Sequence, residues 1–592
     1  MEKLKTVRSG FKADRLKNWI RLYWVFGAGI AVRLVFGLLI GNWFPSAEAY
    51  DDVLMLEYAS LRHHFTEQNF LSLVKYMAYP LFLDVVRYSH LPYALWTGVL
   101  WSAAAVMTYR LFYEIRPHRG IAGFLFFYVL FLPVAFDNWG GTRIYRSGIQ
   151  APFTVFFFAL LILLVLRLVR KEEKPRKIWL PALLLGLVFS FAYYVKEDGL
   201  WLLACLLFAD AVLAAVSIAR AVKEKKQPKP SEVRRLYASI GIPLLVFTAV
   251  TAGYLGINRH FFGVAELNTR TSGEVGSFVQ KLYRINSEDR TGVVWAPLDA
   301  VEQAFEASGT LKQYPKIREN LMKSPFAAGD YSENQIPGDL IGWALRLAVS
   351  ESREGWNEAE VEALFATVNA EIDEAFRQGI LKKDSRIQLL PSAGGKTFPE
   401  IAGLFTPIAK TYSAAVFLEG YQAGISEIPS ENDEIMDVAV QYTNTPYLKD
   451  YSNGREVRTA AAKIAEVLFW VYRIVNVLLI LCMIASFVFW ILTRKKGVSR
   501  IVPGNRATIV FSVLTLVFFV LLSLAYAFAI GWFTSFIFAD GITMYTLIFY
   551  TPAMPVLLAF AYGFGLILFR EYLPVKGRKT EEAQVKDCPG NA

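Results

Sequence analysis

The chain has few cysteines, few histidines and little charge for its length. Three cysteines and five histidines occur among 592 residues. Cys205 and Cys482 fall within apolar runs and Cys588 lies in the last segment, so the sequence predicts no disulfide framework. Histidine and cysteine are also too scattered for the ligand spacing of a zinc site. Only 19% of the residues are charged and 54% are hydrophobic, which excludes an ordinary soluble protein.

Long apolar runs occupy most of the chain. A helix needs roughly 20 apolar residues to cross the hydrocarbon core of a membrane. About ten runs approach or exceed this length, near residues 20–43, 92–112, 121–138, 148–168, 178–195, 199–218, 238–257, 465–493, 507–533 and 543–569. The sequence therefore predicts an all-α polytopic membrane protein with about ten transmembrane helices.

Lysine and arginine mark one side of these runs. They gather before the first run, after the fourth, sixth and eighth, and after the tenth. If the helices alternate in direction, all these segments share one side, which the positive-inside rule makes cytoplasmic. We expect both termini to be cytoplasmic. The formal net charge of +10 thus reflects topology and contact with lipid head groups, and is no evidence for nucleic acid binding.

The runs divide the chain into membrane and external parts. The segment after the seventh run is mildly acidic, and from Glu358 to Leu381 its apolar residues recur every three or four positions, which favours helices. The predicted parts are an N-terminal membrane module at 1–257 with an external loop at 44–90, a mostly α extracytoplasmic domain at 258–463, C-terminal transmembrane helices at 464–571 and a cytoplasmic tail at 572–592.

Two adjacent carboxylates, Asp51 and Asp52, follow the first apolar run closely. They emerge at the outer interface, where a partly desolvated carboxylate can act as a base on a hydroxyl. Solvated loop acids are the alternative interpretation. The residues that follow, from Val53 to Arg62, suit an amphipathic helix lying in the interface.

Several short strings share this external placement. They are Tyr50-Asp-Asp52, Leu73-Val-Lys75, Tyr79-Pro-Leu-Phe-Leu83, Arg143-Ile-Tyr-Arg146, Tyr194-Val-Lys-Glu-Asp-Gly-Leu-Trp201, Asn258-Arg-His-Phe-Phe-Gly263 and Ile336-Pro-Gly-Asp-Leu-Ile-Gly-Trp343. In their order, over roughly residues 20–380, the chain resembles the polytopic glycosyltransferases of the GT-C fold, and within them a group of bacterial members. It departs from that pattern at Lys196, where an arginine is commoner.

The resemblance implies a location, a substrate and a chemistry. The protein would lie in the bacterial inner membrane and transfer a sugar from a polyprenyl-phosphate donor to an envelope acceptor on the extracytoplasmic face. Asp51 would be the base, with Asp52 as a partner that orients the acceptor or holds a divalent ion. Neighbouring residues point in different directions, so inversion by a single displacement is the simpler expectation. The resemblance fixes no cofactor but allows a divalent cation, and the metal ligands, the sugar and the acceptor are left open.

The departing phosphate needs fixed cations, and the external strings supply them. Arg143 and Arg146 could instead pair with Asp137 or with lipid head groups, and Lys75 could extend to the interface as an ordinary membrane lysine. The Lys-Glu-Asp triplet between the fifth and sixth runs could be a solvated turn, although its aromatic setting favours a site. The candidate substrate- and phosphate-binding residues are Lys75, Tyr79, Arg143, Arg146, Lys196, Glu197 and Asp198.

Two other functions fit the composition. One is a transporter or flippase for a lipid-linked saccharide, and the other is a catalytically silent scaffold of the same fold. Transporters tend to show repeated halves with polar residues near the membrane midplane. Here the two halves differ in hydropathy and the acids gather at one face, which favours the enzyme.

Overall fold

The computed structural model describes the chain outside residues 1–22, 46–50, 62–72, 171–175, 225–229, 325, 327–334, 426–432, 496–502, 536–547 and 573–592. Its described residues form helices, turns and a few isolated bridges, with no β-strand among them. The all-α prediction is therefore confirmed for this part of the chain.

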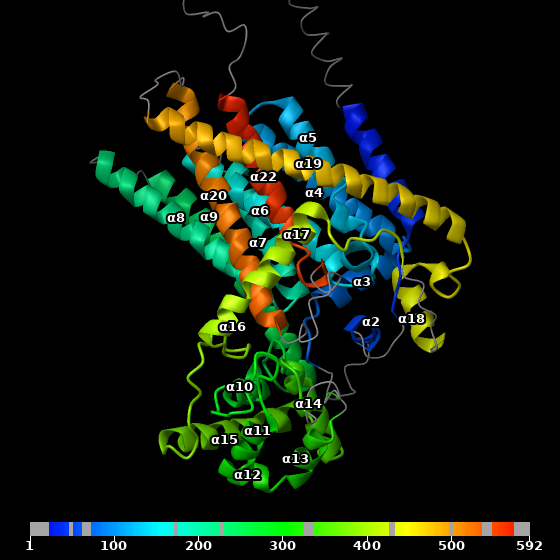
Figure 1. Ribbon diagram of the computed structural model, residues 1–592, viewed down its shortest axis with the longest axis vertical. Helices are drawn as coiled ribbons and strands as arrows, with labels where there is room; N and C mark the ends of the chain where they lie inside the picture. Colours follow the sequence, from blue (N-terminus) through cyan, green and yellow to red (C-terminus); the bar gives the residue numbers. More distant parts are fainter. Residues whose placement is uncertain are drawn as a thin grey trace, which may run out of the picture.

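Eight of the described helices are long and apolar enough to cross a membrane. Their length and hydropathy make the chain a multi-pass membrane protein, as predicted. The helices, which form the upper body in Figure 1, are Tyr23–Ile40, α6 (Ser147–Val169), α7 (Arg176–Val195), α8 (Leu200–Glu224), α9 (Pro230–Phe262), α19 (Arg455–Lys495), α20 (Pro503–Thr534) and α22 (Met554–Tyr572).

Within the described residues, the number of candidate spans is lower than the sequence predicts. Helices α3 (Ala78–Ser89) and α4 (Tyr93–Ile115) meet at a bend of 112° and add a ninth span only if they count as one. The run at 121–138 yields only α5 (Arg119–Leu130), whose 12 residues extend over about 18 Å and are too short to cross the membrane. Pro133 follows closely, and a proline disfavours helical geometry in the residue before it. The described residues therefore hold eight or nine candidate spans instead of about ten.

The membrane helices have two distinct ends. At one end, Arg167 of α6 forms an ion pair with Glu114 of α4 at 2.7 Å, and Arg116 pairs with Glu571 of α22 at the same distance. At the other end lie the residues after the first helix, the segment before α6 and the turn between α7 and α8. The candidate site residues are all at this second end or in the segments that pack against it.

A separate helical domain extends from the second end and is drawn in green in the lower part of Figure 1. Its apolar core includes Phe278, Trp295 and Phe365, and Trp532 of α20 joins it from the membrane body. At its longest helix, Asn357 and Glu360 form a capping box that fixes the start. Its helices are α10 (Gly273–Leu282), α11 (Leu298–Ala307), α12 (Gly309–Lys312), α13 (Pro315–Met322), α14 (Leu340–Ser352), α15 (Glu358–Arg377) and α16 (Phe398–Gly403).

The chain then returns to the membrane body before residue 463. Helix α17 (Phe405–Phe417) packs against α19, α20 and α22, while α18 (Asp433–Thr443) packs against α2 (Asp51–Leu61) and α3. The stretch 258–463 is thus divided in the structure. Its first part forms the helical domain, and its last part covers the membrane end on which the candidate site lies.

Candidate functional site

Backbone pairing fixes the segment that carries the two candidate arginines. The N–H of Trp43 donates to the carbonyl oxygen of Thr142 at 3.1 Å, and the N–H of Ile144 donates back to Trp43 at 2.9 Å. The end of the first membrane helix therefore sets the position of residues 143–146. Arg146 directly precedes α6, so its side chain starts from a rigid helix terminus.

Asp137 fixes the same segment from its other side. Its Oδ2 accepts hydrogen bonds from the backbone N–H groups of Trp139 and Gly140 at 3.0 and 2.7 Å. Its Oδ1 accepts one from the N–H of Gln422 at 3.0 Å. Asp137 therefore links this turn to the chain that returns after α17.

Asp51 lies among charged and polar side chains that we call the Asp51 cluster: Asp51, Lys75, Tyr145, Arg146 and Glu197. Three donors reach the same oxygen, Oδ2 of Asp51: the Lys75 ammonium at 2.8 Å, the Tyr145 hydroxyl at 2.9 Å and the Arg146 guanidinium at 3.1 Å. Arg146 also donates to both carboxylate oxygens of Glu197, at 3.0 and 2.9 Å. The structure thus brings together four of the residues singled out in the sequence, and adds Tyr145.

The cluster opens to its surroundings at Asp51. The side chains of Lys75 and Arg146 are 5% and 2% exposed, whereas that of Asp51 is 35% exposed. Among the described residues nothing donates to the second oxygen of Asp51, Oδ1. Within the described part of the chain, one oxygen is thus saturated by donors and the other is open to an incoming group.

The cations keep both carboxylates of the cluster ionised. Burial alone raises the pKa of Asp51, but the charges of Lys75 and Arg146 and the hydrogen bonds outweigh it, so the pKa lies well below its ordinary value. Burial also opposes ionisation of Glu197, and Arg146 and Lys75 nevertheless lower its pKa to about 2. Desolvation in turn lowers the pKa of Lys75.

Asp52 points elsewhere, into a buried ion pair with Arg143. The guanidinium donates Nε to Oδ1 at 2.8 Å and Nη2 to Oδ2, and the two side chains are 0% and 3% exposed. The rings of Trp139 and Phe549 each lie 4.9 Å from the Arg143 guanidinium carbon. Asp52 and Arg143 thus pair with each other inside the protein, and their predicted contact with substrate stays a prediction.

The remaining candidates lie beside the cluster. The Lys196 ammonium is 3.8 Å from Asp198 and 5.2 Å from the centre of the Tyr550 ring, and desolvation lowers its pKa. Gln150 donates to Asp198 at 3.3 Å. Tyr79 is buried, and its hydroxyl forms a hydrogen bond with that of Tyr93 at 3.2 Å.

The helical domain contributes residues that were not among the candidate site residues. Arg270 donates to Asp339 at 2.5 Å, and the Trp343 ring lies 5.0 Å from the Lys75 ammonium and 5.5 Å from the Arg270 guanidinium. Asp339 and Trp343 belong to one of the strings quoted above, and Tyr145 stands between the two arginines of another. Nothing in the sequence around Arg270 marks it.

Among the residues that the structure describes, no three His, Cys, Asp or Glu side chains are placed to hold a metal ion. No protein-family model, curated protein or solved structure matches the chain. The function must therefore be argued from the residues and their geometry.

Proposed function

We propose that the protein is a multi-pass membrane glycosyltransferase that moves a sugar from a polyprenyl-phosphate donor to an acceptor of the bacterial cell envelope, with inversion. The site would face the extracytoplasmic side of the inner membrane, with both termini in the cytoplasm. The observation that carries the proposal is the Asp51 cluster, in which a carboxylate with one open oxygen is held by two buried cations at the end of a helical membrane bundle.

The surroundings of the cluster suit a donor that arrives from the lipid. Helix α3 follows Lys75 closely and exposes the apolar side chains of Leu81, Val85 and Tyr88. Because exposed apolar side chains on such a helix are expected to contact lipid, α3 would lie at the membrane surface beside the site. A prenyl chain could remain in the bilayer while its phosphate reaches Lys75 and Arg146 from the side.

The residues then divide the reaction between them. The acceptor hydroxyl attacks the anomeric carbon of the sugar as the bond from that carbon to the phosphate oxygen breaks. The electron pair of the broken bond leaves with the polyprenyl phosphate, whose charge Lys75 and Arg146 stabilise. The hydroxyl proton passes to the open Oδ1 of Asp51.

Donor binding would also strengthen the base. In the free protein, Lys75 and Arg146 hold the pKa of Asp51 well below its ordinary value, so its carboxylate is a weak base. A phosphate that draws these cations away from Oδ2 would raise that pKa. Asp51 would therefore accept a proton most readily when the donor is in place.

The direct test is transfer of radiolabelled sugar from a panel of polyprenyl-phosphate donors to envelope fractions, with purified full-length protein. We expect Asp51→Asn to lower the transfer rate by roughly 10²- to 10⁴-fold, the usual contribution of a general base. Asp433→Asn is the matched control, because Asp433 is an exposed acid in the first turn of another helix, α18. It should transfer sugar at the wild-type rate.

Two results would contradict the proposal. One is that wild-type protein transfers no label from any donor. The other is that Asp51→Asn is as active as Asp433→Asn. Movement of intact lipid-linked sugar across proteoliposome membranes without transfer would favour the flippase instead.

A further inference from the structure

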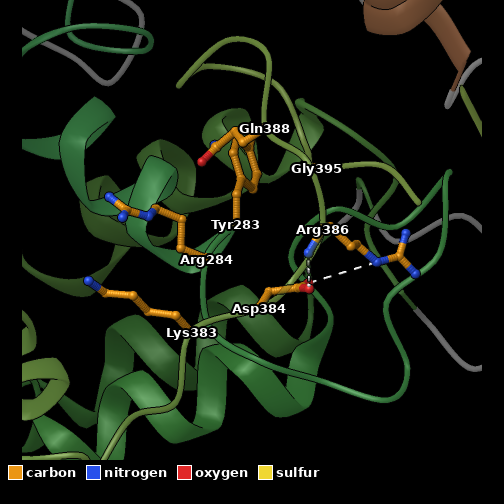
Figure 2. Close-up of a pocket in the computed structure, with 7 residues that line it drawn as sticks. All are labelled: Tyr283, Arg284, Lys383, Asp384, Arg386, Gln388 and Gly395. Atoms are coloured by element: carbon orange, nitrogen blue, oxygen red, sulfur yellow. Dashed lines mark hydrogen bonds and ion pairs between the residues drawn. The ribbon is translucent and has the colours of Figure 1, made fainter. Parts of the chain in front are cut away.

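A polar cavity of about 210 Å³ lies in the helical domain, away from the Asp51 cluster. Figure 2 shows it between the end of α10, with Tyr283 and Arg284, and the segment that carries Lys383, Asp384 and Gln388. The proposed transferase reaction uses none of these residues. Pockets for drug-sized ligands start at roughly 300 Å³, so this cavity suits one small polar unit.

Backbone pairing makes the walls of the cavity rigid. The N–H of Asp384 donates to Arg284 and that of Asn286 to Lys382, both at 2.8 Å. A second pairing joins Ile387 and Lys396 in both directions, at 3.0 and 2.9 Å. Two segments that are distant in sequence are thereby held at a fixed separation.

A buried arginine, Arg290, holds one of the residues that line the cavity, Asp384. The side chain of Arg290 is 1% exposed and donates to the backbone carbonyls of Leu282 at 3.0 Å and of Trp295 at 2.5 Å. Its guanidinium also pairs with Asp384 at 2.8 Å. These contacts orient Asp384 before any ligand arrives, which lowers the entropic cost of binding.

The charges around the cavity do not balance. Arg290 neutralises Asp384, and Glu400 holds Arg386 through two contacts of 2.9 and 2.8 Å. Arg284 and Lys383 are exposed, and neither has a carboxylate partner among the described residues. Two cations therefore remain available to a ligand.

We propose that this cavity binds a single acidic sugar unit, that is, a sugar ring that carries a carboxylate or a phosphate. Arg284 and Lys383 would hold the anionic group by charge-assisted hydrogen bonds. The amide nitrogen of Gln388 donates to the carbonyl oxygens of Pro391 and Ala393, which fixes its side chain. The amide oxygen of Gln388 and the carboxylate of Asp384 offer acceptors for ring hydroxyls, and the Tyr283 ring forms an apolar edge. The proposal does not depend on transfer by the Asp51 cluster.

The test is calorimetric titration of the detergent-solubilised full-length protein with four probes: glucuronate, glucose 6-phosphate, glucose and inorganic phosphate. We expect the two acidic sugars to bind and glucose to bind at least about tenfold more weakly, because it lacks the charge-assisted bonds. Arg284→Ala with Lys383→Ala should weaken the acidic sugars by at least about tenfold. The matched control is Lys312→Ala with Lys316→Ala, which removes the same charge from exposed positions in and beside α12.

Each outcome decides the proposal. Equal loss in both double variants would mean a general charge effect, and binding of inorganic phosphate as tight as that of glucose 6-phosphate would mean an anion site without sugar recognition. Absence of binding by either acidic sugar would also overturn the proposal. The titration and the transfer assay are separate measurements on the wild-type protein, so a failure of binding here is distinguishable from a failure of the proposed transferase activity.

Discussion

Asp51 and Asp52 share the first turn of α2 but belong to two different electrostatic environments. Asp52 is fully buried and meets one arginine through both of its oxygens. Asp51 is partly exposed, and one of its oxygens takes three donors while the other takes none among the described residues. The pair of Asp52 with Arg143 is closed to solvent, whereas the Asp51 cluster is open to it at Asp51.

This difference indicates what each carboxylate can do. A buried pair such as Asp52 with Arg143 is stable only while both partners are present, because a single charge left behind pays the full cost of desolvation. It therefore suits a structural role. The Asp51 cluster meets the outside at one oxygen, and an anionic ligand can replace Asp51 as the partner of Lys75 and Arg146. The Asp51 cluster therefore suits a binding or catalytic role, in which Lys75 and Arg146 exchange Asp51 for a ligand.

The largest effect on stability should come from breaking the closed pair. We expect Arg143→Met to lower the free energy of unfolding by about 3–5 kcal/mol, because Asp52 would remain as a buried, unpaired charge. The measurement is thermal unfolding of the protein in detergent. Asp433→Asn, at an exposed position of α18, should change stability far less.

The double variant Asp52→Leu with Arg143→Met sharpens this test, because apolar residues of similar size can replace a buried pair at little cost. It should recover most of the stability lost in Arg143→Met. If Arg143→Met and Asp433→Asn unfold at the same temperature, or if the double variant recovers none of the loss, Asp52 and Arg143 are not a structural pair.

The sequence reveals the open cluster only in part. The position of Asp51 after the first apolar run indicates an interfacial carboxylate, and the helical repeat implies that Asp51 and Asp52 point in different directions. The sequence does not indicate which of the two aspartates pairs with which arginine. Arg143 and Arg146 are three positions apart in a short non-helical segment, and the pairing of that segment with Trp43 places Arg143 against Asp52.

Long-range packing explains most of the other features that the sequence does not predict. Arg270 and Trp343 reach the cluster because the helical domain packs against the membrane end, and no local pattern encodes that contact. The return of α17 to the membrane body is equally hidden, since its apolar residues would suit either core. The short helix α5 is different, because Pro133 within the run at 121–138 is a visible stop signal.

A smaller effect should appear in the pH dependence of transfer. In the wild type, the pKa of Asp51 lies well below its ordinary value, so kcat/KM should stay flat as the pH falls toward that range. Lys75→Met removes the strongest cationic support of the ionised form and should raise the pKa of Asp51. The acidic limb of the kcat/KM profile should therefore move to higher pH.

Lys75→Arg is the control for this shift, since it keeps the charge beside Asp51 and should leave the limb near its wild-type position. Both variants are expected to bind the donor less well, so the diagnostic quantity is the position of the limb and not the height of the profile. An unchanged limb in Lys75→Met would mean that Lys75 does not set the ionisation of Asp51.

The smallest effect concerns the link between the helical domain and the cluster. The Trp343 ring lies near the charged groups of both Lys75 and Arg270, and a cation–π contact contributes about 0.5–2 kcal/mol. Trp343→Leu should therefore loosen Lys75 and raise KM for the donor by roughly threefold to tenfold, with little change in kcat. Trp343→Phe keeps an aromatic face and should recover much of the loss. If the leucine and phenylalanine variants have the same KM, Trp343 acts by filling space, and the open cluster is held by the membrane helices alone.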